Sequence, residues 1–404
     1  MAITSRFAPE FKVEIAGEPL PAALRGCVTG ITYESGLEGA DRVELNLANP
    51  DLRWLDDPFL QIDNGFELSL GYAPDPLERV FVGEITGVNA NFPGGGMPTL
   101  TVVAHDFMQR MTTGSKTRAF AIDIPCLGVV PIPDPLVVSL VSLTDLLIPY
   151  PDPVGGPLSF LTLVLTYIVD PLEARKAVRV QDGESDFDFL SMIAQENGWD
   201  MYIDHTIDPQ GYIIRFRFPV YDHDPSLTLK YGESLIDFTP RLTTVGQVVG
   251  VSTRIWIAAI QTELVLVLSW DYDRAAFDLM VYPGIGNLDM LLGGMAQSVL
   301  TIEALGPATA PLKILGELLP RLNNRLTGMG STVGDLRIRA GRVIELDGVG
   351  EQFGGKYRIT TATHTIDSGG FRSSFEGRKE IWFGDFPRPK GIGGLFRIQG
   401  QTIR

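Results

Sequence analysis

The chain has 404 residues, of which 45% are hydrophobic, and its formal net charge is −16 at pH 7. This length is enough for two or three globular domains, each with its own core. The acidic balance argues against nucleic acid or an anionic membrane as a partner. Cys27 and Cys126 are the only cysteines, so we expect no disulfide framework. Residues 1–17 contain no long apolar run, which predicts no signal peptide and synthesis in the cytoplasm.

Residues 11–112 consist mostly of short runs in which apolar and polar residues alternate, separated by Gly, Pro, Asp and Asn. Strands at this spacing predict a closed or nearly closed antiparallel β-barrel. We therefore assign residues 1–118 to an N-terminal barrel domain. Glu84 lies inside one of these runs with no comparably buried acidic residue nearby. We interpret it as a hydrogen-bonded strand residue rather than a catalytic acid.

Residues 119–177 have a different composition. They are rich in proline and in apolar runs, and no Lys or Arg occurs between Arg118 and Arg175. We interpret this segment as an insertion with one or two short buried helices or strands. It either covers part of the core or offers an apolar surface to a partner subunit. Its longest uncharged run, 153–169, begins with two prolines and two glycines. The remainder is shorter than the roughly 20 residues that span a bilayer, so we expect no transmembrane helix.

A capped helix is predicted within residues 181–204, QDGESDFDFLSMIAQENGWDMYID. Ser185 and Asp188 form a capping-box pattern at its start. Gly198 fits the left-handed position that commonly follows a helix. The alternating residues after Gly198 predict a strand. We assign residues 178–240 to an α+β middle domain.

From residue 212 onward the β pattern returns, interrupted by a leucine-rich helix expected at about 312–327. We assign residues 241–385 to a second barrel region that contains this helix, and 386–404 to a C-terminal tail. The expected fold class is thus mainly β (α+β). Two antiparallel barrel-like domains flank a helix-containing middle region.

The stretch GVGEQFGGKYRI, residues 348–359, resembles a phosphate-binding loop because G-x-x-x-x-G-K runs from Gly350 to Lys356. Such a loop requires a following helix and a hydroxyl directly after the lysine. Tyr357 stands at that position, and the residues after it alternate in the manner of a strand. We therefore predict a β-hairpin turn rather than a nucleotide site.

Two histidines invite a metal interpretation. His223 lies between Asp222 and Asp224, and His205 follows Asp204. Neighbouring positions on a strand point to opposite faces, so one ion cannot readily use adjacent residues. No zinc-protease, paired-cysteine, EF-hand or nucleophile-elbow motif occurs. We predict no catalytic, cofactor-binding or metal-ligating residues, no cofactor, and no enzymatic activity.

The stretch QDGESDFDFLSMIAQENGWDMYID resembles the signature Q-x-x-E-S-D-x-D-F-L of phage late control D proteins and related baseplate hubs. Residues 229–256 and 338–379 resemble the next two blocks of that family, in the same order. The Pro-rich segment 119–177 does not align. The resemblance implies a homotrimeric hub with an axial channel in a phage tail or contractile injection system. Its implied partners are a spike protein, a tail tube or tube-initiator protein, and baseplate wedge proteins.

Two alternatives belong to other classes of protein. One is a β-rich cell-wall-acting enzyme, and the other is a carbohydrate-binding module of the same particle. A carbohydrate-binding module would expose aromatic platforms. The tryptophans lie mostly in patterns that favour burial: Trp54, Trp199, Trp256, Trp270 and Trp382.

Overall fold

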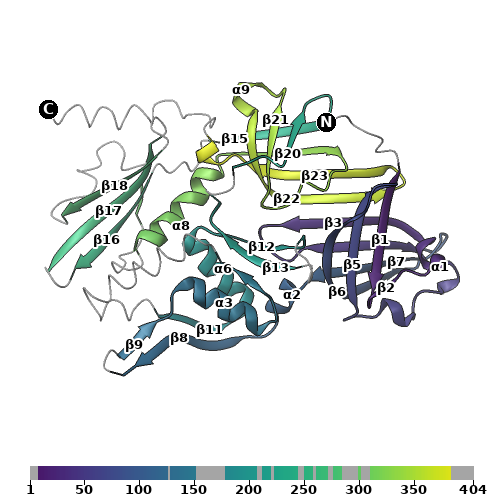
Figure 1. Cartoon of the computed structure of the whole chain (residues 1–404), viewed down its shortest axis with the longest axis horizontal. Coiled ribbons are helices and arrows are strands. Elements are labelled where there is room, and N and C mark those ends of the chain that lie inside the picture. Colours follow the sequence, from purple (N-terminus) through teal and green to yellow (C-terminus); the bar gives the residue numbers. More distant parts are fainter. Residues whose placement is uncertain are drawn as a thin grey trace.

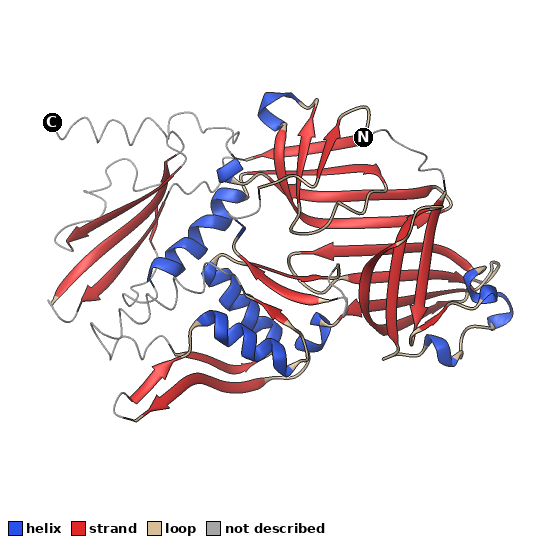
Figure 2. Ribbon diagram, viewed as in Figure 1, coloured by secondary structure: helices blue, strands red, loops and turns tan. Residues whose placement is uncertain are grey.

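The computed structural model describes residues 8–125, 128–151, 178–206, 212–219, 223–243, 250–257, 261–271, 276–283, 299–301 and 310–383. The predicted mainly β fold is confirmed. Figure 1 shows two curved sheets, a middle domain below one of them and beside the other, and a separate sheet on the far side of helix α8. The longer helices gather between the sheets (Figure 2).

The first curved sheet, called the early barrel here, contains seven strands: β1 (Pro9–Ile15), β2 (Glu18–Pro19), β3 (Val28–Gly36), β4 (Arg42–Ala48), β5 (Gly65–Tyr72), β6 (Glu78–Asn91) and β7 (Thr99–Asp106). Their order is β3-β4-β7-β6-β5-β1-β2. Alternate residues fill the core, as Val43, Leu45 and Leu47 do in β4. Short turns lie in its loops: α1 (Ala22–Arg25), η1 (Pro50–Leu52) and η2 (Pro58–Leu60).

The second curved sheet, the late barrel, contains six strands: β14 (Leu227–Lys230), β15 (Leu235–Leu242), β20 (Leu326–Val333), β21 (Val343–Asp347), β22 (Gly355–Asp367) and β23 (Gly370–Arg378). Their order is β14-β21-β22-β23-β20-β15. The pairing is antiparallel except between β14 and β21, which run parallel. Leu229, Ile344 and Tyr357 are among its core residues.

Strand β22 joins the two barrels. Its residues Thr361–Ile366 pair antiparallel with β3, from Thr361 opposite Gly36 to Ile366 opposite Ile31. A register shift between Ile359 and Thr361 separates this half of β22 from the half that pairs with β21. Such irregularities bend a strand and redirect it. The two barrels therefore form one continuous 13-stranded sheet.

The middle domain contains α2 (Met108–Met111), β8 (Lys116–Ile124), β9 (Gly128–Pro131), α3 (Asp134–Thr144), β10 (Pro149–Tyr150), β11 (Arg179–Glu184), α6 (Asp186–Asn197), β12 (Asp200–Asp204) and β13 (Ile213–Arg217). The strands form two small sheets, β11-β8-β9 and β10-β13-β12. The predicted helix is confirmed as α6: the Ser185 hydroxyl accepts the Asp188 N–H at 3.0 Å, and Gly198 has φ +68°.

The middle domain corrects the prediction that residues 119–177 are an insertion. Val137, Val138 and Val141 of α3 share one core with Phe189 and Leu190 of α6. The described residues 119–125 and 128–151 thus belong to the middle domain, and the predicted boundary at 118 falls inside β8. The apolar runs of this segment include the face of α3 that packs beside α6. Residues 152–177, which include the run 153–169, lie outside the described residues. Within the described ranges, no helix has the length and apolar character needed to cross a membrane.

A four-stranded sheet stands apart from both barrels and contains β16 (Gly250–Ile257), β17 (Thr262–Asp271), β18 (Ala276–Pro283) and β19 (Val299–Thr301). Helix α8 (Ala310–Asn323) packs on it, and Ile314 and Leu318 share a core with Val251 and Trp270. The assignment of 241–385 to one barrel is therefore wrong. Strands β14 and β15 belong to the late barrel, whereas β16 to β19 form a separate sheet, because alternation identifies strands but not their partners. The predicted tail, 386–404, lies outside the described residues.

The glycine-rich stretch is a hairpin turn, as predicted. Strands β21 and β22 pair antiparallel, and the single-turn helix α9 (Gly350–Phe353) lies between them. Gly350 and Gly355 adopt φ of +82° and +96°, which favour glycine. Lys356 donates from Nζ to the carbonyl oxygen of His223 at 2.8 Å. This hydrogen bond links the start of β22 to the segment that contains His223.

We expect Gly355→Val to lower the free energy of unfolding by about 1–3 kcal/mol, because valine is strained at φ +96°. Urea denaturation measures the loss. Lys356→Ala is the matched control: it removes one hydrogen bond and should change stability far less. Neither the wild type nor this control should bind ATP. A Gly355→Val chain as stable as the wild type would contradict the assignment.

The outer face of α3 is a leucine stripe, defined as Leu136, Leu140 and Leu143. These residues recur at helical spacing and are 57%, 48% and 53% exposed. After Asp134, the sequence of α3 contains no charged residue. A helix that is apolar on both faces is normally covered on both.

Candidate functional site

The family-like signature forms the start of α6. Gln181 donates from Nε2 to Asp186 Oδ1 at 2.8 Å. Asp186 is buried and also accepts hydrogen bonds from Lys116 and Arg118 of β8. Burial alone would raise the pKa of Asp186, but the hydrogen bonds from Lys116 and Gln181 and the charge of Arg118 hold it below its usual value. The signature therefore ties β8, β11 and α6 together.

A second polar network joins the late barrel to the middle domain. Buried Arg358 donates from Nε to Glu380 at 2.8 Å and from a terminal nitrogen to the Pro219 carbonyl at 2.7 Å. Arg378 binds Glu380 and also Asp200 of β12 at 2.9 Å. Burial raises the pKa of Glu380, although both arginines act to lower it. The late barrel and β12 are thus held by paired buried charges.

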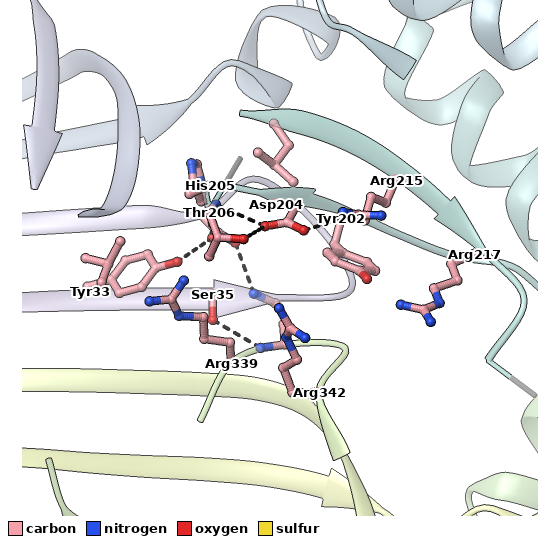
Figure 3. A pocket seen from close by; sticks show the side chains of 15 residues that line it. Tyr33, Ser35, Tyr202, Asp204, His205, Thr206, Arg215, Arg217, Arg339 and Arg342 are labelled. Atoms are coloured by element: carbon pink, nitrogen blue, oxygen red, sulfur yellow. Dashed lines mark hydrogen bonds and ion pairs between the residues drawn. The ribbon is translucent and has the colours of Figure 1, made fainter. Parts of the chain in front are cut away.

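A cavity of about 90 Å³ lies where both barrels meet the middle domain (Figure 3). Its walls include Tyr33, Ser35 and Asp41 of the early barrel, Tyr202, Asp204, His205, Arg215 and Arg217 of the middle domain, and Arg339, Ala340 and Arg342 beside the late barrel. Ligand pockets usually measure about 300–1,000 Å³. The cavity is therefore too small for an ordinary organic substrate.

The alternation of residues in β13 explains why two of its arginines line the cavity. In β13, Ile214 and Phe216 point into the middle core, so Arg215 and Arg217 point to the opposite side. Arg215 binds Asp204 at 2.7 Å. Burial would raise the pKa of Asp204, but hydrogen bonds from Thr206 and the charge of Arg215 lower it. The cavity wall thus carries an ion pair that links β12 to β13 within the middle domain.

A buried cluster adjoins the cavity. His205, at the end of β12, places Nε2 3.3 Å from Asp41 Oδ2 and 3.9 Å from Asp106 Oδ2. The Tyr33 hydroxyl donates to Asp41 Oδ2 at 2.9 Å, and the Asp41 N–H donates to Asp106 Oδ2 at 2.9 Å. The three side chains that could ligate a metal ion, Asp41, Asp106 and His205, have ligand atoms within 4.8 Å of one another.

The cluster has strongly perturbed acid–base properties. Burial raises the pKa of Asp106 well above its usual value, and the neighbouring Asp41 charge raises it further. Burial also raises the pKa of Tyr33, with Asp41 adding to the effect. Sequence reasoning set His205 aside because only its neighbour Asp204 was considered. No local signal could identify the cluster, since its members come from distant segments of the chain.

The other residues weighed from sequence have structural surroundings. Glu84 lies on β6 and binds Arg110, in agreement with a hydrogen-bonded strand residue. His223 stacks edge-on against Phe383. Trp54, Trp199 and Trp270 are buried, whereas Trp256 is 54% exposed on β16, contrary to the expectation from its pattern.

The fold is that of phage-tail-type proteins. The tail protein from Neisseria meningitidis MC58 superposes with a TM-score of 0.60 at 11% identity, covering 94% of this chain and 100% of that one. The 43 kDa tail protein of prophage MuSo2 from Shewanella oneidensis gives 0.60 at 12% identity with the same coverage. The E. coli c3393 protein, described as a type VI secretion component with structural similarity to T4 tail proteins gp27 and gp5, gives 0.55 at 13% identity, covering 94% and 81%.

At the sequence level, a family model described as the Alg8 N-terminal domain matches residues 162–368, just over half of the chain. The chain belongs to this family. The matched range includes α6, the four-stranded sheet, α8 and most of the late barrel. No curated protein sequence matches the chain. The predicted likeness to tail proteins is thus confirmed for the fold, while the family matched differs from the late control D family.

Proposed function

We propose that the chain is a non-enzymatic baseplate hub of the late control D type. In this role, three copies join the inner tube of a phage tail or contractile injection system to its central spike around an axial channel. The observation that carries the proposal is the full-length likeness to tail proteins, which includes 100% of two of them. The signature at residues 181–190 supports it independently. The partners we propose are a spike protein, a tube or tube-initiator protein, and wedge proteins.

The joined barrels suit an adaptor between different symmetries. We take the tube as six-fold and the spike as three-fold, as the family resemblance implies. Closed rings leave no open interfaces, so an adaptor must present both symmetries at once. Each chain carries two barrel-like sheets fused through β3 and β22. Three chains would therefore present six such sheets in one ring.

The leucine stripe on α3 supports contact with a neighbouring copy. Each copy carries a formal charge of −16, so copies repel one another at long range. A contact between like-charged copies is favoured where the surface has no charge, and the stripe is such a surface. Exposed contiguous apolar surfaces commonly mark contacts with other proteins. We place the stripe at the interface between copies in the trimer.

We expect electron microscopy of the chain assembled with tube and spike proteins to show a closed three-fold ring. Leu140→Lys should prevent ring closure while leaving the far-ultraviolet circular dichroism unchanged, because it places a charge in the interface. Ile62→Lys is the matched control, since Ile62 is also an exposed apolar residue but lies in an early-barrel loop. A two-fold dimer, or a chain that remains single in the particle, would contradict the hub. If both variants form rings equally well, the leucine stripe does not lie at the interface between copies.

A further inference from the structure

We propose that Asp41, Asp106 and His205 form a divalent-cation site between the early barrel and the middle domain, with Zn²⁺ as the ion that fits best. The site would be structural, fixing the end of β12 against the early barrel. It does not depend on the hub proposal.

The spacing of the ligand atoms suits one ion. Zinc binds imidazole nitrogen and carboxylate oxygen at about 2.0–2.2 Å, so two tetrahedral ligand atoms lie about 3.3 Å apart. His205 Nε2 and Asp41 Oδ2 are 3.3 Å apart. His205 Nε2 and Asp106 Oδ2 are 3.9 Å apart, so a shift of about half an ångström brings the third ligand into range. One nitrogen with two carboxylates is a donor set that zinc accepts, with a fourth position left for water.

His205 points its free ring nitrogen at this position. The His205 side chain is 2% exposed, and its Nε2 has no hydrogen-bond partner despite lying between two carboxylates. Buried polar atoms are nearly always partnered, so an unpartnered one calls for an explanation. An ion between Nε2 and the two carboxylates would supply the missing partner.

The other ring nitrogen of His205, Nδ1, makes a hydrogen bond that competes with metal binding at Nε2. Nδ1 accepts the backbone N–H of Val82 at 3.3 Å, whereas a metal-bound Nε2 requires the proton on Nδ1. This hydrogen bond is longer than the usual range of about 2.7–3.2 Å and is therefore weak. Metal binding would exchange this weak contact for a metal–nitrogen bond.

The charges of the cluster also call for a cation. Asp41 and Asp106 are buried carboxylates, and their hydrogen-bond donors include neutral backbone N–H groups and the Tyr33 hydroxyl. Arg339, which lines the adjoining cavity, is already bound to Glu78 at 2.8 Å and to the Leu336 carbonyl. Buried charges are normally paired or coordinate metals. The cavity, whose walls include Asp41 and His205, offers the ion a route inward.

The test is metal content of the full chain after incubation with Zn²⁺ and removal of excess ion. We expect about one zinc per chain for the wild type. We expect at least a tenfold loss in His205→Gln and in Asp106→Asn. His105→Gln is the matched control, because His105 lies next to Asp106 in sequence but contacts Thr86 instead. Wild-type content below a tenth of an ion, or undiminished content in His205→Gln, would overturn the site.

A second measurement needs no variant and so does not depend on variant folding. Wild-type chain loaded with Co²⁺ should show the intense visible absorption of a four-coordinate ion, and a chelator should abolish the absorption and lower the melting temperature. An absorption typical of six-coordinate aqueous Co²⁺, with no change in melting temperature, would overturn the site.

Discussion

Replacing Glu380 with alanine should lower the free energy of unfolding by about 3–5 kcal/mol, because removing one partner of a buried ion pair leaves the other charge uncompensated. Glu380 is fully buried and accepts from Arg358 at 2.8 Å. It also binds Arg378 and accepts the Trp382 indole N–H at 2.9 Å. Without Glu380, the buried Arg358 guanidinium would lose this carboxylate, while its hydrogen bonds to the Gly341 and Pro219 carbonyl oxygens carry no compensating charge.

The raised pKa of Glu380 sharpens this expectation. Burial is the main cause of the raised pKa, the Asp200 charge adds to it, and the two arginines oppose it. Replacing a whole buried ion-pair network by apolar residues is often neutral, so the intact network need not add stability over an apolar core. Loss of one partner is nevertheless severe. Urea denaturation of Glu380→Ala measures the loss, and Glu233→Ala, which removes an exposed pair with Lys230, is the control. Equal midpoints for the two variants would contradict the buried-charge argument.

Replacing Gly316 with valine should lower the free energy of unfolding by about 3 kcal/mol, at the upper end of overpacking effects. Gly316 lies where α8 meets the end of α6. An added Cβ would stand 2.5 Å from the carbonyl oxygens of Gln195 and Glu196, which are backbone atoms and cannot turn aside. The helix carrying the four-stranded sheet would then have to move away from the middle domain.

The direction of the stability change caused by a smaller substitution, Gly316→Ala, distinguishes a steric clash at this contact from an effect of helix propensity. In an exposed helix, Gly→Ala stabilises by about 1 kcal/mol. Gly316→Ala should instead destabilise, as thermal or urea unfolding would show. Gly65→Ala serves as the control because nothing lies within 4 Å of its Cβ position. A Gly316→Ala chain more stable than the wild type would mean that α6 and α8 do not touch here.

The sequence by itself determined the elements that depend on near neighbours. Ser185 and Gly198 define the ends of α6 because capping is satisfied within a few residues. The alternation after Tyr357 predicted the strand β22, and the glycines before it predicted the hairpin turn in which Gly350 and Gly355 adopt positive φ. The likeness to tail proteins also came from sequence, through the signature at residues 181–190.

Tertiary structure alone decided which elements meet. Alternation assigns a residue to a face but leaves the partner strand open, so the pairing of β22 with β3 could not be foreseen. For the same reason, strands β16 to β19 were assigned to the wrong sheet. An apolar segment packs wherever space fits it, which is why 119–151 joined the middle domain. The cluster of Asp41, Asp106 and His205 depends on all of these contacts at once, because only the folded chain brings three distant segments together.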